Sequence, residues 1–201
     1  MRITAEEKTA TRQRILDTAI QAFRKRGFES TTTRDIATAA GIATGTLFNY
    51  FATKEAIVEF LAAEALSKAK SRLDQEALEG DLEESLFAYV AAELRQLKPL
   101  RKFITPLLET SLCPLALARR SDSNSVLRVE HMESVVGLAR KHGFPDLSPV
   151  TLQVYWTLYI GVLAFWAVDK SPKQEDTLAL LDQSLTMFVA WLRNEHSETS
   201  K

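Results

Sequence analysis

The segment Thr33–Phe51 constrains the fold of this chain more than any other stretch. It reads TRDIATAAGIATGTLFNYF, and its two short runs with helical spacing are separated by Ala40-Gly41-Ile42. Glycine between two such runs is typical of a tight turn between short helices. Because a helix-turn-helix places its second helix in the groove of a duplex, the segment predicts a nucleic-acid interface.

The residues around this segment predict where the first helices begin and end. Leu16 and Phe23 lie on one helical face, and three basic residues then precede Gly27, which is typical of a helix C-terminus. Thr32 and Asp35 resemble a capping box that opens the next helix, with aspartate in place of the usual glutamate or glutamine. A helix is therefore expected on each side of this turn.

The rest of the chain is also predicted to be helical, because period-two alternation is hard to find and only seven glycines and six prolines occur. The predicted fold class is all-α, with an N-terminal three-helix helix-turn-helix domain and a C-terminal helical domain. The domains are expected at residues 1–55 and 56–201. The later helices are expected at about 54–78, which connects the domains, and at 82–97, 100–112, 122–142, 149–169 and 175–194.

The composition permits a packed core but gives no global sign of nucleic-acid binding. Of 201 residues, 46% are hydrophobic, and the net charge is −1 at pH 7. Residues 1–60 carry nine basic and seven acidic side chains, so nucleic-acid binding would depend on a local patch. Cys113 is the single cysteine, which excludes an intramolecular disulfide and a four-cysteine zinc site. The N-terminus lacks the apolar core of a signal peptide, so a cytoplasmic protein is expected.

The second short helix has an inner and an outer face. Leu47 and Phe51 are four residues apart and are expected to face the core. Gly45 would then let the backbone approach a phosphate closely, and Asn49 would reach an adenine edge or a phosphate. The residues expected to turn outward, toward the nucleic acid, are Thr44, Gly45, Phe48 and Asn49.

Three side chains next to this helix, together with Thr44 within it, are suited to phosphate contacts, and Arg34 is a further candidate for DNA binding. Thr33 lies at a helix N-terminus, where free N–H groups favour an anion, and Arg34 follows it. Tyr50 carries a hydroxyl, and Lys54 adds a point charge at the start of the fourth helix. Because these contacts go to phosphates, we expect DNA binding to weaken with salt.

The sequence Gly41–Phe51, followed by Thr53-Lys54-Glu55, resembles the signature of TetR-family transcriptional regulators. The resemblance covers about residues 12–60; the rest of the chain resembles the family only in its length and helical pattern. It implies a homodimer with a three-helix DNA-binding domain and a larger helical domain that binds a ligand and dimerises. In the family, the positions near operator DNA match Thr33, Ala43, Thr44, Gly45, Phe48, Asn49, Tyr50 and Lys54.

Two positions depart from the family pattern. Tyrosine is usual where Phe48 stands and serine is frequent where Ala43 stands, so two hydroxyl contacts to DNA are missing. Two interpretations of Phe48 are open: it packs among the first three helices, or it contacts a sugar or a thymine methyl group. These departures bear on individual contacts and not on how the unit docks.

The helix expected at 149–169 is apolar on nearly every face from Val154 to Val168, so it must be covered all round. A membrane span needs about 20 apolar residues, and this run is too short and too rich in Tyr, Trp and Thr. A second subunit is the expected cover, and the last helix supports it with apolar residues at coiled-coil spacing. The predicted dimer interface consists of Val162, Trp166, Leu178, Leu181, Leu185, Phe188 and Leu192.

An alternative is that the seam of the last helix packs on the core of its own subunit, because spacing alone does not separate the two cases. A second apolar row with Leu180, Met187 and Trp191 favours contacts on both sides of this helix. Two such helices from each protomer would form a four-helix interface, as in the family.

A pocket for a small, largely apolar effector is expected between the helices at 82–142 and the inner face of the helix at 149–169. His131 shares a helical row with Leu127 and Val135, so it is either a hydrogen-bonded core histidine or a polar anchor for the ligand. The candidate lining residues are Phe87, Phe103, Leu107, Leu108, His131, Met132, Val135, Tyr155, Trp156, Tyr159 and Phe165.

The sequence holds no nucleophile–base constellation, paired-carboxylate motif, phosphate loop or metal-spaced ligands, so no enzyme, cofactor or metal site is expected. We predict a DNA-binding transcriptional regulator, a repressor that a small effector releases from a palindromic operator. The alternative is a DNA-binding protein of the same fold that acts without a small-molecule inducer. The expected partners are double-stranded DNA, a second copy of the chain and the effector, with no membrane.

Overall fold

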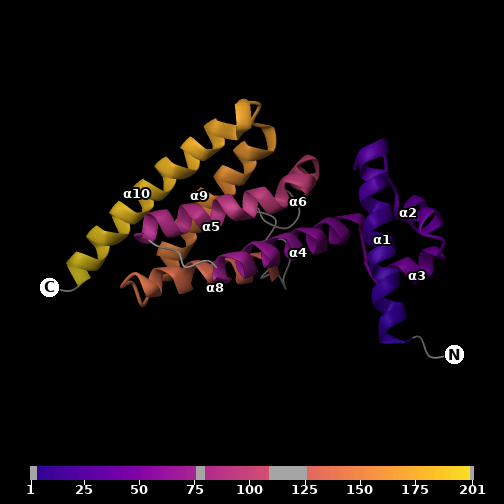
Figure 1. Ribbon diagram of the computed structural model, residues 1–201, viewed down its shortest axis with the longest axis horizontal. Helices are drawn as coiled ribbons and strands as arrows, with labels where there is room; N and C mark the ends of the chain where they lie inside the picture. The colour runs from indigo at the N-terminus through magenta and orange to yellow at the C-terminus, as the bar shows by residue number, and fades with distance from the viewer. Residues whose placement is uncertain (1–3, 76–79, 109–125, 200–201) are drawn as a thin grey trace. The chain divides into compact units, whose positions relative to one another are not determined.

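The computed structural model of this chain describes residues 4–75, 80–108 and 126–199. Every regular element within these ranges is a helix, which confirms the predicted all-α class (Figure 1). The chain divides into two compact units, residues 1–61 (unit 1) and residues 62–201 (unit 2). The division falls inside α4, which spans Lys54–Gln75, a few residues beyond the expected boundary between residues 55 and 56.

Unit 1 consists of three helices and the start of α4. α1 spans Ala5–Arg26, α2 spans Thr33–Ala39 and α3 spans Thr44–Phe48. α2 and α3 lie beside α1 (Figure 1), and the three bury a small apolar core. Its members, each at most 1% exposed, are Ile15, Leu16, Ala19, Phe23, Ile36, Ala37 and Leu47, together with Ile57 and Val58 from the start of α4.

The helix ends of unit 1 follow the sequence signals. Gly27 ends α1 with a φ of 87°, a conformation that favours glycine, and its N–H donates to the carbonyl of Phe23 (2.9 Å). The capping box before α2 is present: the Thr32 N–H donates to Asp35 Oδ2 (3.0 Å), and the Asp35 N–H donates to Thr32 Oγ1 (3.1 Å). Aspartate therefore replaces glutamate in this motif without loss of either bond.

Unit 2 contains the rest of α4 and the longer helices. The expected helix at 82–97 is α5, but the one expected at 100–112 begins as a 3-10 helix with Pro99 in its first turn, and its last residues lie outside the described ranges. The helices of unit 2 are α5 (Leu82–Leu97), η1 (Lys98–Phe103), α6 (Ile104–Leu107), α8 (Val126–Lys141), α9 (Pro149–Val168), η3 (Pro172–Gln174) and α10 (Glu175–Thr199).

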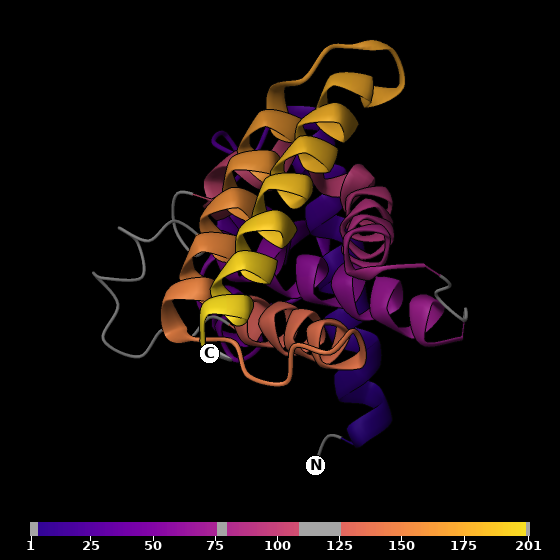
Figure 2. The ribbon, with the colours of Figure 1, turned by 90° about the vertical axis from the view of Figure 1, so that its left-hand side faces the viewer.

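α9 and α10 run side by side (Figure 2), joined by a corner that Arg101 and Asp169 hold in place. The Arg101 guanidinium donates to the carbonyls of Trp166 (2.7 Å) and Asp169, which are free at the end of α9. The Asp169 carboxylate accepts from the Thr177 hydroxyl (2.5 Å) and from the Ser171 N–H (2.7 Å). The Thr177 hydroxyl, helped by the amides of Ser171 and Thr177, lowers the pKa of Asp169 to about 2.

The apolar seam of α10 faces the core of its own unit. Six of the seven side chains assigned to a dimer interface are 0–4% exposed within the single chain, so they are not available to a second subunit. Their prediction as dimer contacts is wrong, because coiled-coil spacing is the same for a seam that packs inside one subunit and for a seam between two subunits. They are Val162, Trp166, Leu181, Leu185, Phe188 and Leu192, whereas Leu178 is 37% exposed.

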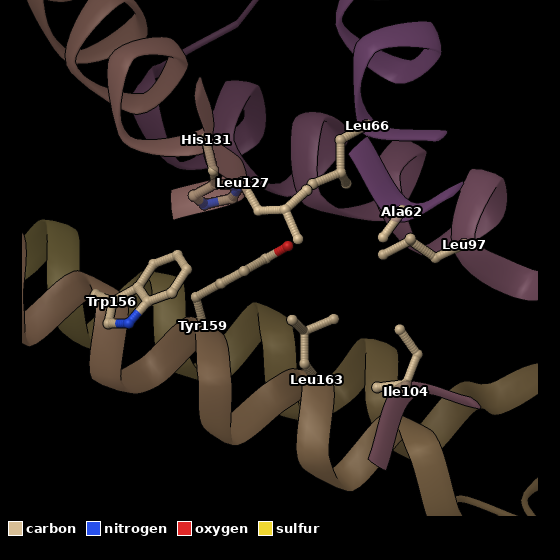
Figure 3. A pocket seen from close by; sticks show the side chains of 9 residues that line it. All are labelled: Ala62, Leu66, Leu97, Ile104, Leu127, His131, Trp156, Tyr159 and Leu163. Atoms are coloured by element: carbon tan, nitrogen blue, oxygen red, sulfur yellow. The ribbon is translucent and has the colours of Figure 1, made fainter. Parts of the chain in front are cut away.

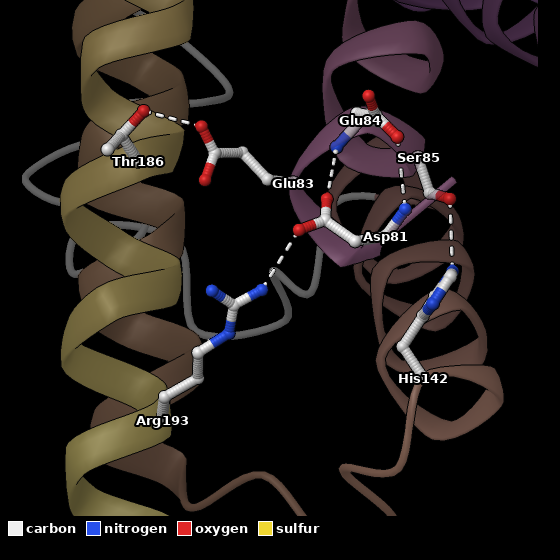
Figure 4. Close-up of polar contacts among 7 residues, drawn as sticks. All are labelled: Asp81, Glu83, Glu84, Ser85, His142, Thr186 and Arg193. Carbon is white, nitrogen blue, oxygen red and sulfur yellow. Dashed lines mark hydrogen bonds and ion pairs between the residues drawn. The ribbon is translucent and has the colours of Figure 1, made fainter.

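Polar contacts tie the start of α5 to α8 and α10 (Figure 4). A hydrogen bond joins Ser85 Oγ and His142 Nε2 (3.0 Å), which connects α5 to the end of α8. Asp81 caps α5 and pairs with Arg193 of α10 at 3.0 Å. These contacts fix the ends of the helices whose middle parts enclose the interior of unit 2.

Candidate nucleic-acid interface and buried cavity

The turn between α2 and α3 depends on Gly41. Its φ is 67°, a left-handed conformation that strains residues with a side chain. The Gly41 N–H donates to the carbonyl of Thr38 (3.1 Å), and the Ile42 N–H donates to that of Ala37 (3.0 Å). These bonds close α2 and direct α3 away from it, so that Leu47 enters the core.

The predicted inner and outer faces of α3 are present. Leu47 and Phe51 are 0% and 5% exposed, whereas Phe48 is 50% exposed. Of the two interpretations of Phe48, packing among the first three helices is therefore wrong. The other expected DNA-binding residues divide into an exposed set (Arg34, Ala43, Gly45 and Asn49) and a half-buried set (Thr33, Thr44, Tyr50 and Lys54).

Lys54, expected as a point charge at the start of the fourth helix, is half-buried and bonded within unit 1. Its Nζ donates to the carbonyls of Phe28 (2.8 Å) and Glu29 (3.2 Å) and lies 4.3 Å from the centroid of the Phe28 ring. The Glu29 carboxylate is 3.8 Å away. Lys54 thus ties the start of α4 to the loop that leads into α2, so it positions the helix-turn-helix unit from within unit 1.

The start of α2 carries an ordered negative charge beside basic residues. Arg26, at the end of α1, pairs with Asp35 at 3.3 Å. Hydrogen bonds from the backbone N–H and the hydroxyl of Thr32 lower the pKa of Asp35, and Arg26 adds to this effect. Asp35 therefore stays ionised and holds Arg26 at the start of α2.

Unit 2 encloses a small apolar cavity (Figure 3). Its volume is about 10 Å³, roughly the space of one water-sized sphere. The hydroxyl of Tyr159 points into it, as Figure 3 shows. The lining side chains come from α4, α5, α6, α8 and α9 and are Ala62, Leu66, Leu97, Ile104, Leu127, His131, Trp156, Tyr159 and Leu163.

Three of the predicted pocket residues, His131, Trp156 and Tyr159, line this cavity. Phe103, Leu108, Val135 and Tyr155 are buried elsewhere in unit 2, Phe87 is half-buried, and the side chain of Leu107 lies outside the described residues. Two others lie on the surface: Met132 in an open groove along α8, and Phe165 on α9 with 39% of its area exposed.

A hydrogen-bonded polar cluster lies next to the cavity. His131 is 1% exposed, with its Nδ1 2.9 Å from Glu93 Oε1 and its Nε2 3.1 Å from the Tyr155 hydroxyl. It is therefore a hydrogen-bonded core histidine, as the first interpretation expected, and it also lines the cavity; its role as a ligand anchor stays a prediction. Burial, followed by the charge of Glu93, raises the pKa of Tyr155 and Tyr159 well above its usual value, so both stay neutral.

Sequence reasoning missed Glu93, which is 0% exposed. A signal for it was available, because Glu93 shares a helical row with the apolar residues Leu86, Val90 and Leu97. An acidic residue in such a row indicates either that the row does not face the core or that the acid is buried with a partner. The partner, His131, was already recognised as a buried polar residue.

The side of α9 and α10 that faces away from the core carries large apolar side chains that are exposed in the single chain. α9 has the length and composition of a membrane-crossing helix, and 39% of its most apolar window is buried. Gly161 and Ala164 on the same face leave room for a close approach by another surface. The large exposed residues are Val150, Val154, Phe165, Val168, Leu178, Leu180 and Met187.

No group of three His, Cys, Asp or Glu side chains that could hold a metal ion is found among the described residues. Cys113 lies outside the described ranges. The two candidate sites are thus the outward residues of α2 and α3 and the cavity with its polar cluster in unit 2.

Comparison with known proteins gives a family for unit 1. Residues 15–61 match the family profile described as bacterial regulatory proteins, tetR family. The HTH-type transcriptional regulator YvkB of Bacillus subtilis is 38% identical over 88 residues, which are 44% of this chain and 46% of that protein. The HTH-type transcriptional repressor KstR2 of Rhodococcus jostii is 46% identical over 52 residues, 26% of each chain. The chain thus spans less than half the length of these curated relatives.

Solved structures resemble the whole chain in fold. FadR of Thermus thermophilus, a TetR-family transcriptional repressor in complex with lauroyl-CoA, has a TM-score of 0.66 at 23% identity, covering 89% of this chain and 93% of its own. A TetR transcriptional regulator from Nitrosomonas europaea has a TM-score of 0.63 at 22% identity, covering 90% of this chain and 99% of its own. At these identities the likeness extends to the fold alone.

Proposed function

We propose that this chain, whose N-terminal unit belongs to the tetR family of bacterial regulatory proteins, is a cytoplasmic transcriptional repressor that binds a palindromic DNA operator as a homodimer. A small, largely apolar effector that enters unit 2 releases it from the operator. The observation that carries the proposal is the surface of α3, where Phe48 is 50% exposed and Asn49 is exposed while Leu47 is fully buried. Phe48 and Asn49 thus lie on the outward side of the second helix of a helix-turn-helix, which is the helix that enters the groove of a duplex.

The exposed residues of unit 1 have separate roles in this proposal. Asn49 reads a base edge, Thr44 and Tyr50 donate to phosphates, and Arg34 adds a nearby charge. Phe48 lacks the hydroxyl for a phosphate contact, so its ring contacts a thymine methyl group. Lys54 acts mainly by holding the loop before α2, since two of its N–H groups are used within unit 1.

A homodimer forms through the exposed apolar face of α9 and α10. Val150, Val154 and Met187 belong to this face, and burial of such residues against a second copy is favourable by about 25 cal/mol per Å². The same burial accounts for an apolar α9 without a membrane. A two-fold dimer presents two copies of α3, which is why the operator is expected to be palindromic.

The effector enters at the cavity, and α4 carries its effect. Ala62 and Leu66 of α4 line the cavity, and Lys54 at the start of the same helix holds the loop before α2. A ligand that enlarges the cavity displaces α4 and thereby shifts the population of DNA-binding conformations. The name of the KstR2 relative and the lauroyl-CoA complex of the FadR structure support repression and an apolar effector by analogy.

The small cavity favours a second candidate, a DNA-binding protein of this fold that acts without an inducer. A volume of about 10 Å³ holds no effector unless side chains move. Under this alternative the interior of unit 2 is an ordinary core and only DNA and the second copy bind.

Selection of bound fragments from a random duplex pool by the purified chain tests the proposal. The expected result is enrichment of one palindromic sequence, with loss of enrichment in Asn49→Ala. Replacing thymine by uracil in the enriched sequence removes only methyl groups, and at the base that Phe48 contacts it is expected to weaken binding. A pool that stays random after selection would contradict DNA-sequence recognition.

A further inference from the structure

The interior of unit 2 contains a buried acidic group that is only half used. Glu93 is 0% exposed, and its Oε1 lies 2.9 Å from His131 Nδ1. Its other oxygen, Oε2, has no hydrogen-bond partner among the described residues. Leaving a buried charged oxygen unsatisfied is costly, so a group that donates to it would be bound tightly.

Aromatic rings surround this carboxylate and its histidine. The His131 ring stacks on Tyr159 at 3.9 Å between centroids and lies 5.3 Å from Tyr89 and 5.9 Å from Trp156. Burial raises the pKa of Tyr159 and Tyr155, so these rings add no competing charge. Faces of Trp and Tyr around a point attract cations through their negative ring faces.

The cavity is apolar along its length and meets this cluster at one end. His131 and Tyr159 form the polar end, while Leu66, Leu97 and Ile104 are among the aliphatic residues that line the remainder (Figure 3). Through His131 this end is connected directly to Glu93. A ligand that enters when these side chains move apart would therefore contact mostly aliphatic groups, with one polar group placed near Tyr159.

The basic side chains that lie nearby are engaged outside the cavity. Arg128 lies over the Trp156 ring at 5.3 Å and donates to Gln153 Oε1 (3.0 Å). Arg101 binds the carbonyls at the end of α9. None of the nine residues that line the cavity is a lysine or an arginine. The acidic group next to the cavity is thus Glu93, which the lining residue His131 connects to it.

We propose that the effector is an apolar amine, whose protonated nitrogen binds at the polar end of the cavity within the aromatic rings and is stabilised by Glu93. The proposal rests on the cavity of unit 2 being the effector site. An ammonium group gains from the buried carboxylate and from the faces of Tyr159 and Trp156, whereas an alcohol gains only a hydrogen bond. A carboxylate would meet Glu93 with the same sign of charge and is excluded from this end.

Three probes with the same eight-carbon chain separate these cases. Octylamine is protonated at pH 7, octanol is neutral and octanoate is ionised. The melting temperature of the full chain and its release from the enriched DNA are measured with each probe. The expected order of stabilisation is octylamine above octanol above octanoate, with an apparent Kd for octylamine roughly tenfold below that for octanol. Octanoate binding as tightly as octylamine would overturn the proposal.

Glu93→Gln tests the residue, since it keeps the shape and removes the charge. In this variant octylamine and octanol are expected to bind with about equal apparent Kd values. The preference for octylamine is expected to persist in the control Glu133→Gln, which removes an exposed charge from α8. A preference that survives Glu93→Gln would overturn the role of Glu93. If this variant does not fold, the order of the three probes on the wild-type chain still decides.

The same experiment distinguishes this inference from the proposed function. If all three probes stabilise the protein equally and release the DNA, the effector cavity stands and the amine preference fails. If none changes the melting temperature, the cavity is not an effector site and both fail. DNA recognition by unit 1 is measured separately and stands or fails without the probes.

Discussion

Unit 1 and unit 2 are both helical, but they distribute polar and apolar side chains in opposite ways. In α1, α2 and α3 the charged side chains are exposed or half-buried around an apolar core, and the outward apolar ring is Phe48. Unit 2 buries Glu93 and His131 completely and exposes a row of large apolar residues on α9 and α10. The surface of unit 1 is therefore polar apart from the Phe48 ring, whereas the polar pair of unit 2, Glu93 and His131, lies in its interior.

The difference shows what each unit requires to be complete. The charged side chains of unit 1 are exposed or half-buried and stay solvated without a partner, and the proposed partner is a charged duplex. The outer face of α9 and α10 and the unsatisfied oxygen of Glu93 are both unfavourable in isolation. A second copy and an effector would remove these two costs, so binding and stability are coupled in unit 2 and largely separate in unit 1.

The largest expected effect concerns the buried pair of unit 2. His131→Leu leaves the Glu93 carboxylate buried without its partner, which typically costs about 3–5 kcal/mol. The double variant Glu93→Leu with His131→Leu removes both members of the pair and is expected to recover most of that loss. Urea unfolding followed by circular dichroism measures both free energies. A single variant that is no less stable than the double would contradict the account of this pair.

The next effect tests the exposed face of unit 2. Met187 is 60% exposed, so Met187→Glu places a charge on the proposed interface without disturbing the core of the protomer. The dissociation constant of the dimer is expected to rise roughly thirtyfold, which corresponds to about 2 kcal/mol. Light scattering over a dilution series follows the mass, with Ser67→Glu on the exposed side of α4 as control. A wild-type chain that stays monomeric at micromolar concentration would contradict the proposed homodimer.

A smaller effect is expected within unit 1. Lys54→Met keeps the aliphatic stem but loses the bonds to the carbonyls of Phe28 and Glu29, at a cost of about 1–2 kcal/mol. Because the loop before α2 loosens, affinity is expected to fall by a similar factor for all DNA sequences. Lys25→Met removes an exposed charge from α1 and serves as control. Equal effects of the two variants on thermal stability would show that Lys54 acts only through its charge.

The smallest effect is a dependence of unit 2 on acid. Asp169 has a pKa of about 2 in the folded chain, below its ordinary value of 3.8, so the unfolded chain binds its proton first as the pH falls. Its contribution to stability is complete above pH 4 and is lost as the pH falls toward 2. Melting temperatures from pH 5 to pH 2 are expected to fall more steeply for the wild type than for Asp169→Asn. Parallel curves would contradict the role of this corner.

Much of unit 1 was predictable from sequence because its structure depends on neighbours in the chain. The capping box of Thr32 and Asp35, the turn at Gly41 and the inner face of Leu47 each depend on residues within a few positions. The exposure of Phe48 was left open because both a core and a surface environment accept an aromatic ring. The carbonyls bound by Lys54 could not be predicted, since they lie 25 and 26 residues away.

Less of unit 2 was predictable because its features depend on distant segments. The cavity combines side chains from α4, α5, α6, α8 and α9, and its aliphatic members look like ordinary core residues in the sequence. The sequence predicts the apolar seam of α10, but spacing does not tell whether that seam faces the core of its own subunit or a partner. Burial in the structure decides this, and it moves the proposed interface to the row that contains Leu180 and Met187.

Sequence-specific DNA recognition by unit 1 is tested most directly by the ratio of two affinities. The Kd of the full chain is measured for the enriched palindrome and for a scrambled duplex of the same length, at the same salt concentration. The expected ratio is about a thousandfold or more, and both affinities are expected to fall as salt is raised. A ratio near one at every salt concentration would contradict sequence-specific recognition.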